Sequence, residues 1–144
     1  MKKEGGMINP DVQFFISGDP VAQGRGQIIK KGLHYGIKDP EKSKSWKEYV
    51  KLVASQHAPS VLLTGPLYVT MTFAFQRPKS KPKWKRWKDT KPDLDNLWKG
   101  CADAMEGVIY ERDQQICAGY FAKKFVGQHE KPGVQAHAGL YIRQ

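Results

Sequence analysis

Apolar and polar side chains alternate strictly along residues 66–76. The apolar side chains on one side of this alternation are Leu67, Val69, Met71, Phe73 and Phe75. A period of two puts every second side chain on the same face of an extended backbone. We therefore predict a strand over residues 66–76 with its apolar face in the core.

Shorter apolar runs, each bounded by turn residues, predict the other strands. Residues 12–16 end at the turn sequence SGDP, and residues 27–37 suit an irregular hairpin around Lys31 and Gly32. Two more strands are expected near residues 115–126 and 134–143, joined by the turn-rich sequence GQHEKPG. Short strands separated by Gly, Pro, Asn, Asp and Ser are typical of hairpins and sheet edges.

Two segments repeat their apolar residues with the period of a helix instead. Residues 43–57 have such a stripe, and Pro59 stops the pattern. The stripe consists of Trp46, Tyr49, Val50 and Val53. Strands and helices in this order predict one α+β domain over residues 1–144, with an α/β-type mixed sheet and two helices packed on it.

The second helix is expected to begin at Asp95 or Asn96, either of which can cap it, and to end near Glu106. Gly107 suits the stop, and Lys99 is expected to pair with an acid one turn later, Asp103. The buried stripe of this helix should contain Leu97, Cys101, Ala104, Met105 and Val108.

The positive charge of the chain is concentrated in residues 77–92, the basic segment. Eight of its sixteen residues are Lys or Arg and one is Asp, so it carries +7 of the net charge of +10. Such a concentration favours a polyanionic partner, either nucleic acid or an anionic surface, over a role in solubility alone. Charge repulsion and three prolines predict a mobile loop.

Two carboxylates follow the basic segment directly. Pro92 keeps the preceding residue out of the helical region, so Asp93 and Asp95 are expected in an extended stretch with their side chains on one face. Mg²⁺ prefers few carboxylates combined with water and phosphate oxygen. The residues after the helix can span roughly 23 Å. This exceeds the helix length of about 16–18 Å, so Asp113 can reach the pair.

A plainer interpretation of these residues remains open. An Asp-x-Asp pair before a helix also serves as a cap with a solvated neighbour, and Lys99 can be a surface lysine paired with Asp103. The adjacent basic segment instead favours metal-assisted phosphodiester chemistry at Asp93, Asp95 and Asp113. Lys99 would then stabilise negative charge on the scissile phosphate.

Several other classes of protein are disfavoured. No run of roughly 20 apolar residues is present, so no membrane partner is expected. Two cysteines form neither a disulfide framework nor a zinc motif, which indicates a reducing, cytoplasmic compartment. An EF-hand is excluded because Trp98 occupies its glycine position. The chain has no phosphate-binding glycine loop, so no nucleotide cofactor is expected.

The pattern DLDNLxK at residues 93–99, followed by Asp103-Ala104 and Asp113-x-Gln115, resembles the RusA-type Holliday-junction resolvases. These are small endodeoxyribonucleases common in prophages. The opening segment, residues 16–21 followed by Gly24-Arg25, is also similar to that family. The resemblance covers most of the chain and is most specific in residues 91–124.

The resemblance implies a RusA-like homodimer that binds branched DNA, a four-way junction, and resolves it by paired cuts with Mg²⁺ or, in its place, Mn²⁺. It implies that Asp93, Asp95 and Asp113 are the catalytic, metal-binding acids and that Lys99 is the essential lysine. The chain departs from the family at Arg112, where many members have a second acid. Glu111 is a candidate replacement for that acid.

The basic segment is expected to grip backbone phosphates and to order on binding. Trp84 and Trp87 either stack on unpaired bases or pack on the protein itself. Lys123 falls where the family tends to carry a later basic residue. The expected DNA contacts are Arg25, Arg77, Lys79, Lys81, Lys83, Trp84, Lys85, Arg86, Trp87, Lys88, Lys91 and Lys123. The alternatives are a non-catalytic DNA- or RNA-binding module and a metal-dependent nuclease that prefers flaps or single strands.

Overall fold

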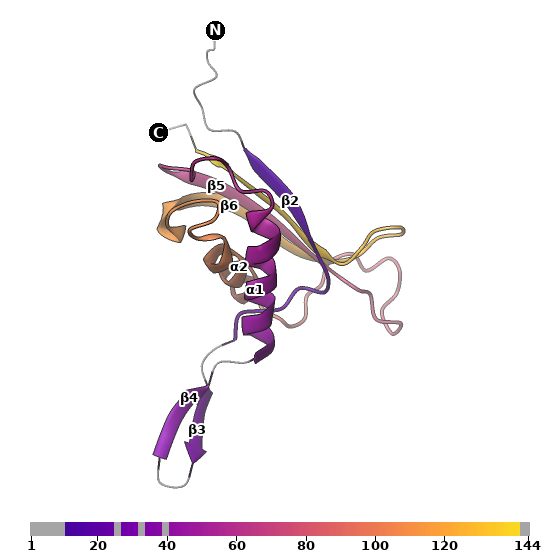
Figure 1. The fold of residues 1–144 in the computed structure, drawn as a ribbon. Helices are drawn as coiled ribbons and strands as arrows, with labels where there is room; N and C mark the ends of the chain where they lie inside the picture. Colours follow the sequence, from indigo (N-terminus) through magenta and orange to yellow (C-terminus); the bar gives the residue numbers. More distant parts are fainter. Residues whose placement is uncertain (1–10, 25–26, 32–33, 39–40, 142–144) are drawn as a thin grey trace.

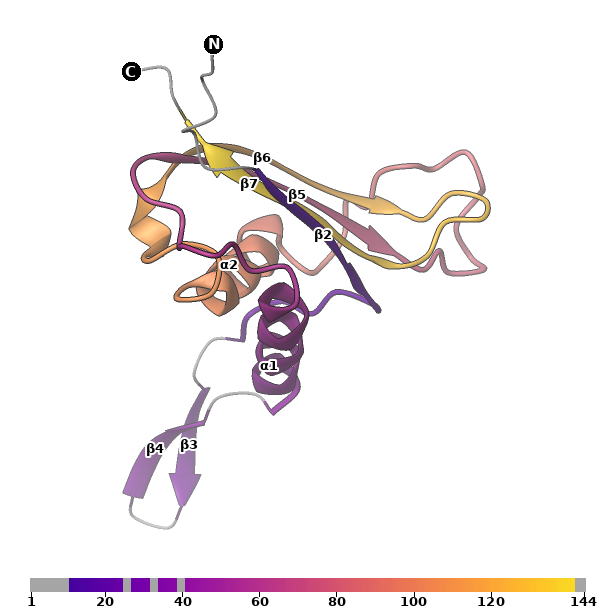
Figure 2. The same ribbon diagram turned by 45° about the horizontal axis from the view of Figure 1, so that its top comes forward.

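The computed structural model describes residues 11–24, 27–31, 34–38 and 41–141. Four strands form a mixed sheet in the order β2-β7-β5-β6, and two helices cover one of its faces (Figures 1 and 2). The strands are β2 (Val12–Ser17), β5 (Leu67–Phe75), β6 (Ile116–Phe125) and β7 (Gly133–Leu140). The predicted α+β architecture is confirmed.

The core lies between the sheet and the helices. The alternation predicted for β5 is confirmed, because Leu67, Val69, Met71 and Phe73 are fully buried and Phe75 is 9% exposed. β2 and β7 add apolar side chains to the same face of the sheet. These are Val12, Phe14, Ile16, Val134, Ala136 and Ala138.

Helix α1 (Glu41–Ser55) begins two residues before its predicted start and ends before Pro59. Trp46 and Val50 are buried as expected, but Tyr49 is 38% exposed. The prediction for Tyr49 was wrong because the buried face is centred on a line that also contains Ser43 and Ala54. Among the described residues, no helix is long and apolar enough to cross a membrane.

The predicted hairpin is confirmed. β3 (Gln27–Lys31) pairs antiparallel with β4 (His34–Lys38) as a separate two-stranded sheet. Figure 1 shows it apart from the four-stranded sheet, beyond the first turn of α1. Arg25, one of the predicted DNA contacts, lies outside the described residues.

β5, helix α2 (Leu94–Met105) and β6 form a parallel crossover unit. Because β5 and β6 are parallel, their carboxyl ends meet at one edge of the sheet, where Phe75 pairs with Phe125. Ligand sites in open sheets with parallel strands gather at this edge. The basic segment and the start of α2 follow β5 there, whereas Asp113 precedes β6 at the opposite edge.

Candidate functional site

Asp93 is the N-cap of α2, with an extended backbone (φ −68°, ψ 139°) and no hydrogen bond from its side chain to the helix. The helix therefore starts at Leu94 and already contains Asp95. The prediction of a cap at Asp95 or Asn96 was wrong, and of the stretch predicted to be extended only Asp93 is extended. The physical reason is that Pro92 restricts only the residue before it, so the helix can begin directly after Asp93.

Asp95 and Lys99 form an ion pair one helical turn apart, with 3.8 Å between carboxylate Oδ2 and Nζ. The predicted partner of Lys99 was wrong, because Asp103 pairs with Lys47 of α1 at 2.9 Å. Both side chains of the Asp95–Lys99 pair are about half exposed, and solvent weakens such pairs. The Lys99 ammonium group is therefore available to a negatively charged ligand.

The opening segment of the chain packs beside the start of α2. The backbone N–H of Gln23 donates to the carbonyl oxygen of Asn96 at 2.8 Å. Adding a Cβ to Gly100 would bring it to 3.4 Å from the Gln23 Cβ. The two sequence segments that carry the resemblance, near residue 20 and residue 95, are thus in contact.

A cavity of about 350 Å³ lies between α2 and the start of β6. It brings together Lys99 and Asp113, two of the predicted catalytic residues, and Asp103 shares its wall. The remaining lining residues are Gln23, Trp98, Ala102 and Ile116. One cation and two carboxylates therefore line this cavity.

Asp113 begins a short 3-10 helix, η1 (Asp113–Gln115), that is held at two points. Its backbone N–H donates to carboxylate Oε2 of Glu106 at 2.8 Å. The Gln115 side chain accepts the N–H of Arg112 at 2.7 Å and donates to the carbonyls of Leu63 and Gly65, both at 3.1 Å. Asp113 is thus fixed to the C-terminal end of α2.

Burial raises the pKa of Asp113 above its ordinary value, and the negative charges of Glu106 and Asp103 raise it further. Three acids therefore share one neighbourhood at this end of α2. Glu106 was not among the predicted site residues. A signal for it existed in the sequence, because Asp95, Lys99, Asp103 and Glu106 follow helical spacing along one side of α2.

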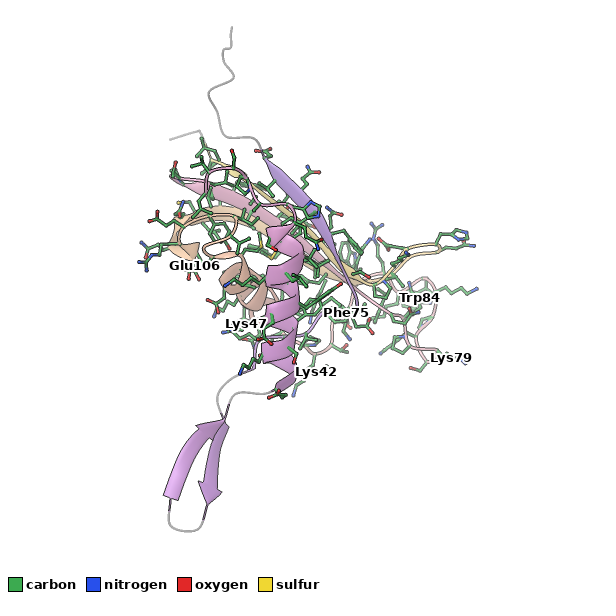
Figure 3. All side chains as sticks on the ribbon, viewed as in Figure 1. Lys42, Lys47, Phe75, Lys79, Trp84 and Glu106 are labelled. Atoms are coloured by element: carbon green, nitrogen blue, oxygen red, sulfur yellow. The ribbon has the colours of Figure 1, made fainter. Side chains whose placement is uncertain are left out.

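In the described chain, Asp113 lies at the C-terminal end of α2, whereas Asp93 and Asp95 lie at its start. Among the described residues, no group of three His, Cys, Asp or Glu side chains is arranged to hold a metal ion. The topology explains this, because the chain returns toward the start of α2 as strand β6, and Asp113 comes before that return. Figure 3 shows Glu106 on the opposite side of the molecule from Lys79 and Trp84 of the basic segment.

Arg77 anchors the basic segment from within. Its guanidinium group donates to the carbonyls of Pro82 at 2.9 Å, of Lys85 and of Val126 at 3.4 Å. The same group lies 5.3 Å from the centre of the Phe125 ring. These contacts fasten the segment to the end of β6, and its predicted mobility stays a prediction.

The cations of the basic segment divide into two groups. Lys85 binds Asp89 at 2.9 Å. Lys88 lies over the rings of Phe75 and Phe125, and burial together with the charge of Lys123 lowers its pKa. Arg77, Lys85 and Lys88 thus make internal contacts, as does Lys123 of β6, another predicted DNA contact, through the carbonyls of Thr90 and Pro92. The exposed cations are Lys79, Lys83, Arg86 and Lys91, with Lys81 half-buried.

A cleft of about 770 Å³ opens between the basic segment and the turn after β6. Its lining residues are Gln76, Arg77, Pro78, Lys79, Lys81, Pro82, Lys83, Val126, Gly127 and Gln128, with no carboxylate among them. Trp84 follows this lining in the chain and is 81% exposed, so it does not pack on the described protein. Trp87 is 51% exposed, with the Arg86 guanidinium 5.3 Å from its ring centre.

A family profile and two relatives match this chain. The profile of Endodeoxyribonuclease RusA matches residues 17–136. Uncharacterized protein YqaN of Bacillus subtilis (strain 168) is 41% identical over 117 residues, 73% of this chain and 81% of that protein. Crossover junction endodeoxyribonuclease rusA of Lactococcus phage r1t is 41% identical over 59 residues, 41% of this chain and 44% of that protein. The chain belongs to the RusA endodeoxyribonuclease family.

Proposed function

We propose that this chain is a Mg²⁺-dependent endonuclease that resolves four-way DNA junctions by paired cuts in the cytoplasm. The observation that carries the proposal is that the basic segment and the start of α2 lie together at the carboxyl ends of β5 and β6. The family motif at residues 93–99 begins directly after the basic segment, which holds most of the net positive charge. A phage relative bears the name crossover junction endodeoxyribonuclease.

DNA binding is assigned to the cleft beside the basic segment. Lys79, Lys81 and Lys83 line it without competing carboxylates, so phosphate oxygens are the ligands that suit it. Trp84 projects into solvent, where stacking on an unpaired base at the junction centre would cover it. Binding of this kind reads shape and charge rather than sequence.

The two carboxylates at the start of α2 suit a Mg²⁺ ion, which usually takes only one or two ligands from protein carboxylates. Both Asp93 and Asp95 are exposed, and the Asp93 side chain makes no cap hydrogen bond. They would hold the ion, or Mn²⁺ in its place, with water and DNA phosphate as the other ligands. A bound ion would supply an activated water and shield the leaving oxygen. Lys99 would balance negative charge on the phosphate.

The position of Asp113 at the C-terminal end of α2 bears on the homodimer. Symmetric paired cuts suit a two-fold dimer on a two-fold junction. Since Asp113 lies at the C-terminal end of α2, whereas Asp93 and Asp95 lie at its start, we propose that Asp113 completes the site of the second subunit.

Mixing two inactive variants tests this arrangement. Asp93→Asn and Asp113→Asn are each expected to be inactive, but refolding them together should restore nicking of the junction. In the mixed dimer one site contains both substitutions and the other contains none. The matched control mixes Asp93→Asn with Asp95→Asn, which leaves no intact site. Failure of the first mixture to gain activity over the control would contradict the shared site.

The rival function is a non-catalytic DNA- or RNA-binding module. It predicts binding that weakens steeply with salt but no metal-dependent product. Side-by-side digestion of a four-way junction, a flap and a linear duplex, each with Mg²⁺ or EDTA, separates the possibilities. Symmetric products from the junction alone are expected. Faster cleavage of the flap would indicate a different nuclease, and no product on any substrate would leave the binding module.

A further inference from the structure

We propose that Lys123 is a positioning residue that fixes the chain entering α2, and with it Asp93. Its basic character suggests a phosphate contact, but its ammonium group is already engaged. The Nζ atom lies 2.5 Å from the carbonyl oxygen of Thr90 and 2.5 Å from that of Pro92. The consequence for cleavage rests on the proposed function, whereas the positioning itself rests on these contacts.

Lys123 stands at an inward-facing position of β6. In the parallel ladder it is opposite Phe73, which is fully buried on the helix-covered face. Its neighbours on that face are Phe121, stacked on Trp98 of α2 with 4.7 Å between ring centres, and the buried Phe125. An ammonium group on an apolar, partly buried face requires hydrogen-bond acceptors. From this position the side chain reaches the two carbonyls.

The Pro92 carbonyl is the more informative partner. It belongs to the peptide unit whose nitrogen is that of Asp93, and such a unit is rigid and planar. Holding its oxygen therefore constrains the position from which the Asp93 side chain leaves the backbone. The Asp93 side chain makes no cap hydrogen bond. The hydrogen bond from Lys123 to the Pro92 carbonyl therefore restrains the backbone next to Asp93 from outside the helix.

The backbone of β6 near Lys123 also binds residues 86–88, which precede Thr90 and Pro92 in the chain that leads into α2. Lys88 N–H donates to the carbonyl of Lys123 at 3.3 Å, and Phe125 N–H donates to that of Arg86 at 2.9 Å. An inward charge can also protect an unpaired edge strand from other chains. That role does not account for Lys123, because residues 86–88 already pair with this part of the edge.

Cleavage assays with Lys123→Met test the consequence. The half-saturating Mg²⁺ concentration should rise about 10–100-fold, as for other partners that orient metal ligands. The slope of junction affinity against salt should stay as in the wild type. The matched control is Lys83→Met, an exposed lysine of the cleft, for which the salt slope should fall by about 0.9. Its Mg²⁺ requirement, measured at saturating DNA, should not change.

Limited trypsin digestion of the free protein tests the positioning without any nuclease activity. In Lys123→Met, trypsin should cut the Lys88–Asp89 bond about tenfold faster. Without the hydrogen bonds of Lys123, residues 86–92 should separate from β6 more often. The Lys83→Met control should be cut there at the wild-type rate. If the wild type does not cleave DNA, the proposed function fails, but the trypsin comparison still tests whether Lys123 positions the chain that leads into α2. Unchanged protection together with a lowered salt slope would make Lys123 a phosphate contact.

Discussion

Replacing Asp93 with Asn is expected to abolish cleavage of a four-way junction while leaving junction binding intact. The substitution keeps the shape of the side chain and removes the negative charge that a divalent cation needs. Loss of several kcal/mol of transition-state stabilisation corresponds to a rate decrease of at least about 10³-fold. Asn caps a helix as well as Asp does, so α2 should still form.

The control for Asp93→Asn is Glu41→Gln, which neutralises an acid in the first turn of the other helix. Single-turnover cleavage with Mg²⁺ and junction binding in EDTA would be measured for both variants. Cleavage by Glu41→Gln should match the wild type. Wild-type cleavage by Asp93→Asn would remove Asp93 from the site, and a parallel loss of binding would indicate damage to the fold instead.

Neutralising Lys79, Lys81 and Lys83 together, by substitution with Gln, is expected to weaken junction binding strongly. Each phosphate contact contributes about 0.9 to the salt slope. Three lost contacts should therefore reduce the slope by about 3 and the affinity by about 10²–10³-fold at 0.1 M salt. Titration of labelled junction at several salt concentrations, in EDTA, measures both quantities. Trp84 remains in this variant, so the loss isolates the charge.

The control for the lysine triple is a second triple with the same change in net charge, Lys42, Lys44 and Lys51 to Gln. These exposed lysines lie on α1, and Figure 3 shows Lys42 away from Lys79. Charges beyond about 10 Å are largely screened at 0.1 M salt, so affinity should stay within about threefold of the wild type. Equal loss in both triples would mean that overall charge, not the cleft, drives binding.

Much of the local structure could be predicted because it depends on residues close in sequence. The alternation that ends at Phe75 and the helical stripe around Leu97 each report one face of one element. Their residues are buried as expected except Val108, which follows the end of α2 and is partly buried. The start of α2 was harder to predict. Asp93 and Asp95 can each cap a helix, so the sequence leaves the first residue of α2 uncertain by about two positions.

By itself, the sequence determined the α+β class, the concentration of positive charge in residues 77–92 and the motif at residues 93–99 that marks the family. Only the tertiary structure decided which groups meet: the Lys47 and Asp103 side chains, Lys123 and the Pro92 carbonyl, and the Asp113 N–H and the Glu106 carboxylate. These contacts depend on sheet order. Because β5 and β6 are parallel, α2 must carry the chain back to the amino ends of the strands before β6 begins. Asp113 directly precedes β6 and therefore lies at the C-terminal end of α2.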